Sequence, residues 1–467
     1  MQKTHSSENQ VLYTETEAKI SKKIAEAMLL YQEEKFEKAV NILIQLEHGI
    51  KTHGPLLSTI GDLLLKLNDF DRAIIYYTKV IAIEPRHLRA LRHRGYAYRE
   101  LALYDQARVD LEQVLSTDHD EKALIALAAV LWEQSAYNDL IQLQTLAGEP
   151  KNFKPELAAL FALAAHALSK CEIKRNNLEK LQAYTKSNPE IDDLIKGVEI
   201  HIKGTLDNLP TLIENPNKHG KHPGQNVRNG EMLLIPSRME EYATKRKFIY
   251  YAAADRTYAS RYAAMLRESF IQNTTDEHLH LHLMLKDEEE FETFKHLSCS
   301  SVSLSYDKIK NADKVWYTIH RYLKLTELLN AFKCPIVLMD IDSKILGSFE
   351  TLVHSAENFD VAIYTRDKEL YYRQLVKAGL FIANPTEGAE RFLKHFEQQI
   401  SLRSQSGKLA WFSDQEALLE SITWAQTTAA TKVGKIPDFN MTWRNQVHPR
   451  AKLRTFKGVQ KLQYLRD

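Results

Sequence analysis

The sequence predicts two unlike folds in one chain, an all-α helical-repeat superhelix in the N-terminal half and an α/β domain in the C-terminal half. The first half repeats small and aromatic residues at a fixed period, and in the second half short apolar runs alternate with helical stretches. The chain has 467 residues, more than one hydrophobic core usually organises. We therefore expect a repeat domain at 1–203, a linker at 204–246 and an α/β domain at 247–467.

The overall composition points away from nucleic acid and from membranes. Lys and Arg number 62 against 61 Asp and Glu, so no global field attracts the chain to nucleic acid. The first ten residues lack an apolar signal-peptide core, and the apolar runs are too short to cross a bilayer. Three cysteines without paired spacing are typical of a reducing compartment. We expect a soluble, cytoplasmic protein without a transmembrane segment, in which each cysteine is a small buried residue.

A repeat with a period of 34 residues occupies the first half. The repeat is marked by an aromatic residue followed three positions later by an alanine, in the pairs Phe36 and Ala39, Phe70 and Ala73, and Tyr104 and Ala107. Small residues at Gly61 and Gly95 suit places where two helices cross closely. These features resemble the tetratricopeptide repeat. A degenerate unit is expected around Trp132, and 155–203 is expected to hold further repeats or a cap.

The resemblance implies a possible protein partner, because stacked repeats form a superhelix whose concave groove usually holds one. Arg89, Arg92 and Arg99 are expected to point into that groove, with Arg86 at its entrance, which would suit an acidic or phosphorylated ligand. The alternative is a solvated helix face neutralised by nearby carboxylates.

Alternating strands and helices are expected after the linker, in which Pro and Gly alternate. This alternation predicts a mostly parallel sheet covered on both faces. The expected strands are 247–254, 278–285, 335–342, 360–365 and 379–384, and the main helices are 258–271, 317–332 and 386–400. In the second strand His278, His280 and His282 alternate with leucines. This pattern could hold zinc, but we prefer to interpret it as a partly exposed edge strand.

The strongest chemical motif is the run PIVLMDID at 335–342, an apolar strand that ends in Asp340, Ile341 and Asp342. Ligands of parallel sheets bind beyond the carboxyl ends of the strands. Two carboxylates there form a hard-oxygen site suited to Mn²⁺ or Mg²⁺, which would neutralise a diphosphate and the charge that develops on a leaving nucleotide. The sequence therefore predicts a divalent metal at Asp340 and Asp342.

Six motifs in order resemble the retaining GT-A glycosyltransferases that include bacterial lipooligosaccharide galactosyltransferases and glycogenin. The motifs, spread over 247–462, are AAADRTY, the helix HRYLKLTELL that carries Arg321 and Lys324, the Asp-Ile-Asp strand end, KAGLFIANP, FSDQEALL and TFKGVQK. The resemblance implies an α/β GT-A nucleotide-diphospho-sugar transferase fold. It also implies metal-dependent transfer of a hexose, with retention, from a nucleoside diphosphate sugar to a hydroxyl of a glycan or protein acceptor. A UDP-sugar is the favoured donor.

The same resemblance gives roles to individual residues. The donor would be bound by Ala254, Asp255, Tyr258, Arg321, Lys324, Ile341 and Lys461. Asp414 and Gln415 would contact the transferred sugar or the acceptor, and Lys377 stands where the family has an Asn that faces the sugar. Asp255 and Asp414 could instead cap the helices that follow them.

The last motif departs from the family at its metal ligand. The family's His-Phe-x-Gly-x-x-Lys is here TFKGVQK, so Thr455 stands in the place of the histidine. The third metal ligand is then His448, Thr455 or water, and we expect weak metal binding. The competing hypothesis is a non-catalytic adaptor whose repeats bind a protein and whose transferase domain is degenerate, which Lys377 and Thr455 support.

Overall fold

The computed structural model describes residues 18–33, 35–47, 53–146, 154–184, 189–212, 248–309, 314–437, 440–442 and 450–455. Of these, the residues up to Cys171 form one compact unit, and those from Glu172 onward form a second. In these ranges no helix is both long and apolar enough to cross a bilayer.

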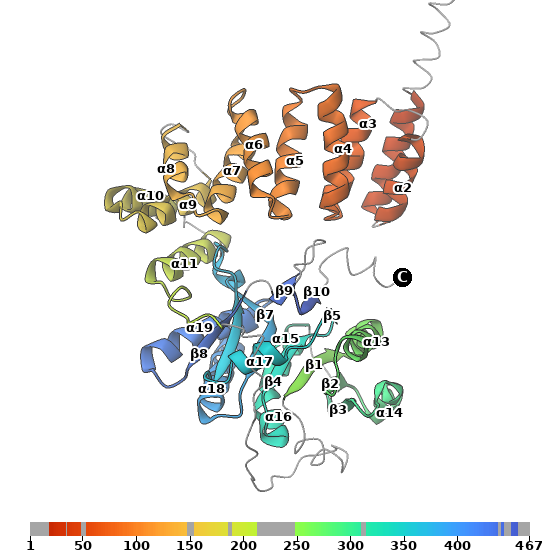
Figure 1. The fold of residues 1–467 in the computed structure, drawn as a ribbon, viewed down its shortest axis with the longest axis vertical. Helices are drawn as coiled ribbons and strands as arrows, with labels where there is room; N and C mark the ends of the chain where they lie inside the picture. The colour runs from red at the N-terminus through yellow and green to blue at the C-terminus, as the bar shows by residue number, and fades with distance from the viewer. Residues whose placement is uncertain are drawn as a thin grey trace, which may run out of the picture. The chain divides into compact units, whose positions relative to one another are not determined.

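The repeat unit is a row of helices packed side by side, as the labels α2 to α7 show in Figure 1. Phe36, Phe70 and Tyr104, the aromatic residues of the repeat, are the first residues of α2, α4 and α6. After a first helix at 18–32, the helices of this unit are α2 (Phe36–Glu47), α3 (Gly54–Lys66), α4 (Phe70–Ile83), α5 (Leu88–Glu100), α6 (Tyr104–Leu115), α7 (Glu121–Glu133), α8 (Tyr137–Leu146) and α9 (Pro155–Ala167).

Small residues lie where the helices of this unit cross. A Cβ atom on Gly61 would lie 2.9 Å from the ring of Tyr77, and one on Gly95 would lie 2.9 Å from the side chain of Leu111. Because real Cβ atoms do not approach other atoms so closely, a larger residue would push the helices apart. The repeat alanines are fully buried: Ala39, Ala73 and Ala107.

The turn between the paired helices has the same hydrogen bond in successive repeats. The N–H of the residue after the turn donates to the carbonyl five residues earlier, as in a Schellman ending. These bonds recur at intervals of 33 or 34 residues, from Lys35 to Leu30, Asp69 to Leu64, Leu103 to Tyr98, Ala136 to Leu131 and Lys170 to Ala165. The degenerate unit expected around Trp132 is therefore a repeat, and the period extends to residue 170.

The arginines expected in the groove have carboxylate partners. Arg89 pairs with Asp62, Arg92 with Asp120, and Arg99 with Glu100 at 2.6 Å. The structure thus shows the alternative interpretation, a helix face neutralised by neighbouring carboxylates.

The second unit is built on a seven-stranded sheet in the order β3-β2-β1-β4-β7-β6-β8. β7 runs antiparallel to β4 and β6, and the other pairs described in this sheet are parallel. A small sheet has the order β5-β10-β9. The strands are β1 (Ile249–Asp255), β2 (Leu279–Leu285), β3 (Val302–Lys308), β4 (Ile336–Asp340), β5 (Ser343–Ile345), β6 (Val361–Thr365), β7 (Val376–Ala383), β8 (Val433–Ile436), β9 (Met441–Thr442) and β10 (Leu453–Thr455).

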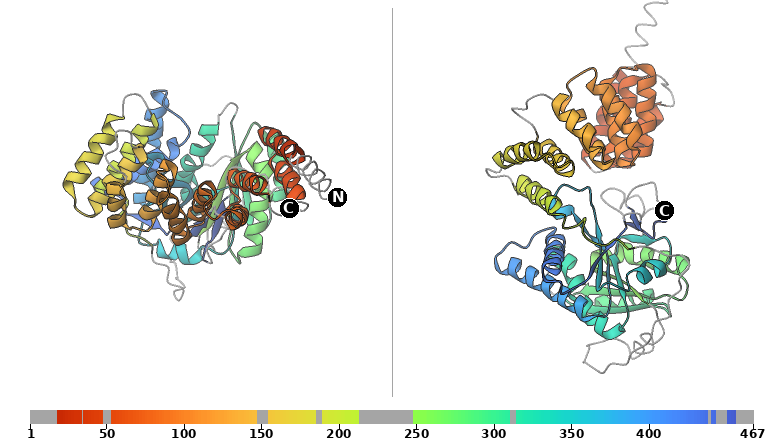
Figure 2. Two further views of the ribbon diagram at one scale, coloured as in Figure 1. Left: turned by 90° about the horizontal axis from the view of Figure 1, so that it is seen from above. Right: turned by 60° about the vertical axis from the view of Figure 1, so that its left-hand side comes forward.

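Helices cover both faces of this sheet, as the two views in Figure 2 show. One core, around Tyr251 and Leu338, packs under α16, α18 and α19, and the other, around Tyr250 and Val337, packs under α13 and α17. This mostly parallel, doubly covered sheet confirms the α/β prediction and is compatible with a GT-A fold. The helices are α10 (Cys171–Ala183), α11 (Pro189–Lys203), α13 (Arg256–Asn273), α14 (Glu288–Glu292), α15 (Lys314–Leu323), α16 (Leu325–Phe332), α17 (Glu350–Ser355), α18 (Glu387–Gln405) and α19 (Ser413–Thr428).

Two predictions about burial are wrong. Strand β2 is not an edge, because it lies between β3 and β1, and its three histidines are fully buried. Serines of β3 supply the hydrogen-bond partners that make this burial possible. Of the cysteines, Cys334 is buried but Cys171 is exposed.

The end of the repeats falls earlier than the boundary expected at 203, because α11 packs on the α/β unit. Asp193 accepts a hydrogen bond from the backbone N–H of Arg373 at 3.0 Å, and His201 Nε2 lies 2.6 Å from the carbonyl of Glu369. The start of the expected linker is also ordered, since the N–H of Leu212 donates to the carbonyl of Lys435 in β8 at 2.9 Å. The remainder of that linker, 213–246, lies outside the described residues.

Candidate active site at the end of strand β4

The predicted metal motif lies at the carboxyl end of β4, where Asp340 is the last strand residue. Its carboxylate is one-third exposed. The antiparallel neighbour β7 places Leu380 opposite Met339, so Gly379 comes beside Asp340. A Cβ on Gly379 would lie 2.6 Å from Asp340 Oδ2. Glycine at 379 is therefore needed to leave room for this carboxylate.

Arg321 of α15 joins two of the predicted carboxylates. Its guanidinium donates to Asp340 and also to Asp414 Oδ2, the latter at 3.3 Å. Arg321 and Asp414 are both buried. The structure thus brings together residues from α15, β4 and α19 that the resemblance assigned to donor, metal and sugar.

One guanidinium faces two carboxyl groups in this cluster. Burial raises the pKa of Asp414, although the Arg321 guanidinium opposes the shift. Burial would lower the pKa of Arg321, but the Asp340 carboxylate outweighs it and raises that pKa. Arg321 therefore stays charged, and Asp414 holds a proton more readily than an ordinary aspartate.

The small sheet places Thr455 opposite the residue that follows Asp342. Asp342 is buried and precedes Ser343, the first residue of β5, which pairs across the ladder with Thr455 of β10. The hydroxyl of Thr455 is buried and has no hydrogen-bond partner among the described residues. The residue in the place of the family's histidine thus lies next to the metal motif with a free oxygen.

Asp340, Asp342 and Thr455 offer oxygen atoms of the kinds that divalent ions accept. Carboxylate and hydroxyl oxygens suit Mg²⁺ and Mn²⁺. Among the described residues, no third His, Cys, Asp or Glu ligand forms a cluster with Asp340 and Asp342. Ions of this kind are often held by one or two carboxylates and completed by water and substrate phosphates. His448 and Lys461 lie outside the described residues.

Other predicted residues have local structural partners. Asp255 caps α13 by accepting a hydrogen bond from the N–H of Tyr258 at 2.8 Å, as the capping alternative expected. Tyr258 is half-buried against Tyr262, and Ala254 and Ile341 are buried. Lys377 is buried in β7. With its amide nitrogen facing β7, Gln415 donates to the carbonyls of Arg373, at 3.0 Å, and Val376.

Lys324 belongs to a different cluster from Arg321. Its ammonium pairs with Asp307 at 3.1 Å and with Glu327 at 2.5 Å. Asp307 also accepts from His320 Nε2 at 2.8 Å. The sequence interpretation missed Asp307 and His320. The alternation of Ser with apolar residues in SVSLSYD was the available signal, because it predicts a strand with a polar face beside the histidine strand.

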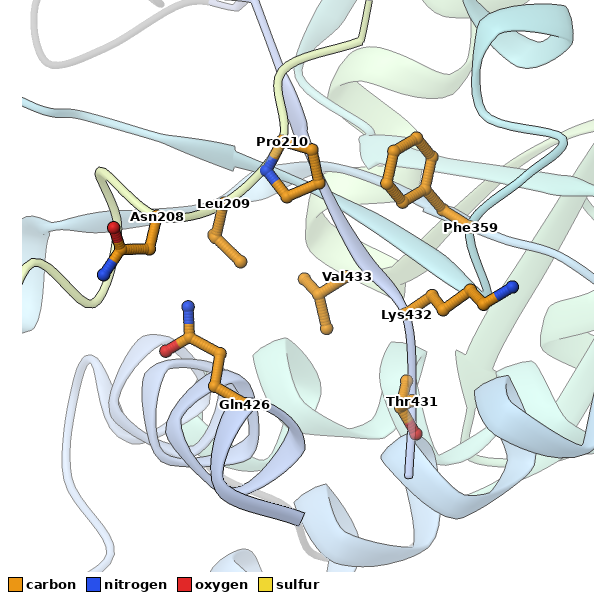
Figure 3. A pocket seen from close by; sticks show the side chains of 8 residues that line it. All are labelled: Asn208, Leu209, Pro210, Phe359, Gln426, Thr431, Lys432 and Val433. Carbon is orange, nitrogen blue, oxygen red and sulfur yellow. The ribbon is translucent and has the colours of Figure 1, made fainter. Parts of the chain in front are cut away.

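A pocket of about 350 Å³ lies elsewhere in this unit, lined by Leu209, Phe359, Gln426 and Val433 among others (Figure 3). It borders the first residue of β8 and the residues just before β6. Because these are the amino ends of the strands, the pocket is at the opposite end of the sheet from Asp340. We take the Asp340 cluster, not this pocket, as the candidate active site.

Comparison with known proteins identifies the first unit. A family model described as tetratricopeptide repeat matches residues 55–87. Comparison with curated proteins gives no match.

Several solved structures resemble part of this chain, with low TM-scores. A MamA fragment from Desulfovibrio magneticus RS-1 is 18% identical, with a TM-score of 0.34, covering 36% of this chain and 98% of its own. A tetratricopeptide repeat protein from Parabacteroides merdae is 17% identical, with a TM-score of 0.34, covering 40% and 73%. Pseudomonas aeruginosa PilF is 14% identical, with a TM-score of 0.34, covering 41% and 86%. Together, the family match at residues 55–87 and the recurring turn bond support tetratricopeptide repeats in the N-terminal unit of this chain.

Proposed function

We propose that the α/β unit is a glycosyltransferase that moves a hexose from a nucleoside diphosphate sugar, favoured as a UDP-sugar, to an acceptor hydroxyl with the help of Mn²⁺ or Mg²⁺. The observation that best supports this is the convergence of Asp340, Arg321 and Asp414 at the carboxyl end of β4, with Gly379 making room for the carboxylate. Acidic groups at this end of a parallel sheet are placed where substrates of such sheets bind.

Different residues of the α/β unit would bind the metal ion, the donor and the sugar. Asp340 and Asp342 would hold the ion, with the Thr455 hydroxyl as an added oxygen, and the bound ion would neutralise the diphosphate as it leaves. Arg321 holds Asp340 in place and keeps a positive charge beside the donor site. Asp414 is oriented by Arg321 and by the N–H of Gln415, at 2.9 Å, so that it can bind a sugar hydroxyl. Retention rests on the family resemblance alone.

The repeats would bind the acceptor or a protein partner. Tetratricopeptide arrays are typical of protein-binding and adaptor regions, because stacked units present a long groove. We therefore assign recognition to the residues before 172 and chemistry to the residues after them.

The alternative function is a protein-binding adaptor with an inactive α/β unit. Two observations favour it: Arg321 already neutralises Asp340, and the third ligand position holds a threonine. The two proposals differ in whether the α/β unit binds a nucleotide with the help of a metal ion.

Calorimetric titration separates them. The wild-type protein is titrated with a nucleoside diphosphate in the presence and absence of Mn²⁺, beside Thr455→His and His448→Ala. We expect metal-dependent binding that tightens in Thr455→His, because imidazole is a better ligand for Mn²⁺ than a hydroxyl. Loss of binding in His448→Ala would instead make His448 the third ligand. No nucleotide binding with any metal would favour the adaptor.

A further inference from the structure

A ladder of buried polar side chains runs between β2 and β3. Ser303 lies between His278 and His280, at 2.7 and 2.9 Å, and Ser305 lies between His280 and His282, at 2.9 and 2.8 Å. All five side chains are buried in the face of the sheet that carries Asp340. Buried polar groups are retained where each finds a partner, so the ladder explains how three histidines fit inside this unit.

The ladder ends in a group of three potential metal ligands. One ring nitrogen of His282, a carboxylate oxygen of Asp307 and one ring nitrogen of His320 all lie within 4.8 Å of one another. They come from β2, β3 and α15. His320 Nε2 is 2.8 Å from Asp307 Oδ2, and His282 Nε2 is 3.4 Å from the same oxygen. Ligands of one zinc ion have similar separations, since each Zn–N or Zn–O bond is about 2.0–2.2 Å long.

His282 is a member of this group with a buried ring nitrogen that makes no hydrogen bond among the described residues. Its ring is completely buried, and among the described residues Nε2 has no hydrogen-bond partner. Its other nitrogen, Nδ1, is fixed by Ser305 at 2.8 Å. A metal-binding histidine is commonly oriented in this way, through a hydrogen bond on the nitrogen that does not bind the ion.

We propose that His282, Asp307 and His320 form a Zn²⁺ site, separate from the Asp340 motif. Two imidazoles and one carboxylate are a donor set that zinc accepts, with the fourth position left to water. Asp307 is one-third exposed, which gives an ion a way in. This proposal does not depend on the glycosyltransferase function.

The protonation states suit the ion. Burial lowers the pKa of His282, so the ring is neutral at pH 7, as a metal ligand must be. For Asp307, burial acts to raise the pKa, but the neighbouring side chains of His282, His320 and Lys324 outweigh it and hold the pKa below the ordinary value. The carboxylate is therefore ionised before any metal arrives.

Lys324 competes with the ion for Asp307. Its ammonium lies 3.1 Å from Asp307 Oδ1, but it also contacts Glu327 at 2.5 Å. An incoming Zn²⁺ could displace Lys324 from Asp307 and leave it paired with Glu327. Removing the Lys324 charge should then tighten zinc binding, a result that a purely structural histidine cluster would not give.

Zinc would also act on the candidate active site through α15. This helix carries His320 and, as the next residue, Arg321, which binds Asp340 and Asp414. An ion that ties α15 to β2 and β3 would therefore help to fix Arg321.

The test uses the full chain, stripped of metal by a chelator, and titrated with Zn²⁺ in competition with a chromophoric chelator. Wild type is expected to bind one tight zinc. His320→Ala should weaken that binding at least tenfold, Ser305→Ala about 10–100-fold through loss of the His282 orientation, and Lys324→Ala should strengthen it. Co²⁺ in the site should give visible absorption that is lost in His320→Ala.

Two controls separate this site from others. His354→Ala removes a histidine that pairs only with Glu357 among the described residues, and the double variant Asp340→Asn, Asp342→Asn removes the other metal motif. Both should keep the tight zinc. The proposal fails if wild type binds no tight zinc, if the tight zinc disappears with Asp340 and Asp342, or if neither Ser305→Ala nor Lys324→Ala changes the affinity. Ser305→Ala and Lys324→Ala keep the test valid should His320→Ala not fold.

Discussion

The two units of this chain pair their charges in different ways. In the repeats, Arg89 reaches Asp62 on the preceding helix pair, and its side chain is 58% exposed. In the α/β unit, Arg321 reaches Asp414, which is 93 positions away, and both are buried. Exposed pairs add little to stability, whereas a buried charge depends on its partner. The repeats are therefore expected to tolerate charge changes that the α/β unit does not.

The largest loss of stability is expected when the chain is cut on the wrong side of the boundary between the units. A fragment that begins at 189 keeps α11 and the segment up to 212, whereas a fragment that begins at 213 loses the buried side chains of Ile200, Leu206 and Leu209. Each such side chain contributes about 1.5–3 kcal/mol, which together approaches the whole stability of a domain. We expect the longer fragment to melt cooperatively by circular dichroism and the shorter one to be unfolded. Equal melting of the two would contradict this boundary.

The second prediction tests the difference in charge pairing directly. Arg321→Ala leaves Asp414 buried without its guanidinium and should lower the free energy of unfolding by about 3–5 kcal/mol. Arg89→Ala is the matched control in the repeats and should cost about 0–1 kcal/mol. Urea unfolding of the full chain measures both. Similar losses in the two variants would mean that burial does not distinguish the two kinds of pair.

Gly379→Ala should affect the candidate site more than the fold. The new Cβ would lie 2.6 Å from Asp340 Oδ2, so the carboxylate must move. A crowded substitution of this kind costs about 1–3 kcal/mol of stability, while metal-dependent nucleotide binding should weaken at least tenfold. Gly347→Ala is the control, because nothing lies within 4 Å of its added Cβ. Unchanged metal-dependent binding in Gly379→Ala would remove Asp340 from the metal site.

The smallest effect is a pH dependence in the repeats. Burial acts to raise the pKa of Asp62, but hydrogen bonds from His93 and Tyr77 outweigh it and lower that pKa below its ordinary value. Since the folded pKa is the lower one, the stability that Asp62 contributes is present above the ordinary carboxyl range and is lost as the pH falls through the lowered pKa. Hydrogen-exchange protection factors in α3 to α5 should therefore fall in acid, and fall less in Asp62→Asn. An equal acid response in the variant would count against this assignment.

How much of each unit could be predicted depends on how far apart in the sequence the contacting residues lie. In the repeats, Gly61 meets Tyr77 and Gly95 meets Leu111, so these contacts lie within one period and the repeat pattern reveals them. In the α/β unit the strand end at Asp340 was predicted, because an apolar run that stops at two carboxylates is a local signal. The resemblance assigned Arg321, Asp340 and Asp414 to donor, metal and sugar. That Arg321 joins the two carboxylates was not predicted, since no local pattern links α15 with α19.

The histidines of β2 show where the sequence was not enough. Alternation placed them on one face, but their burial depended on Ser303 and Ser305 in a strand that was not predicted. The linker from 204 shows the same limit. Its Pro and Gly content predicted a free connection, whereas Leu212 pairs with Lys435, more than two hundred residues later.

Turnover of a nucleotide-sugar donor tests most directly whether the α/β unit is the metal-dependent glycosyltransferase that we propose. Purified full-length protein is incubated with Mn²⁺ and a panel of nucleoside diphosphate sugars, and release of the nucleoside diphosphate is measured for wild type, Asp340→Asn and Asp342→Asn. We expect hydrolysis of at least one donor by wild type, abolished by chelation and reduced about a thousandfold or more in both variants, because metal-assisted charge neutralisation is worth several kcal/mol. No turnover of any donor by folded wild-type protein, or wild-type rates in the variants, would contradict the claim.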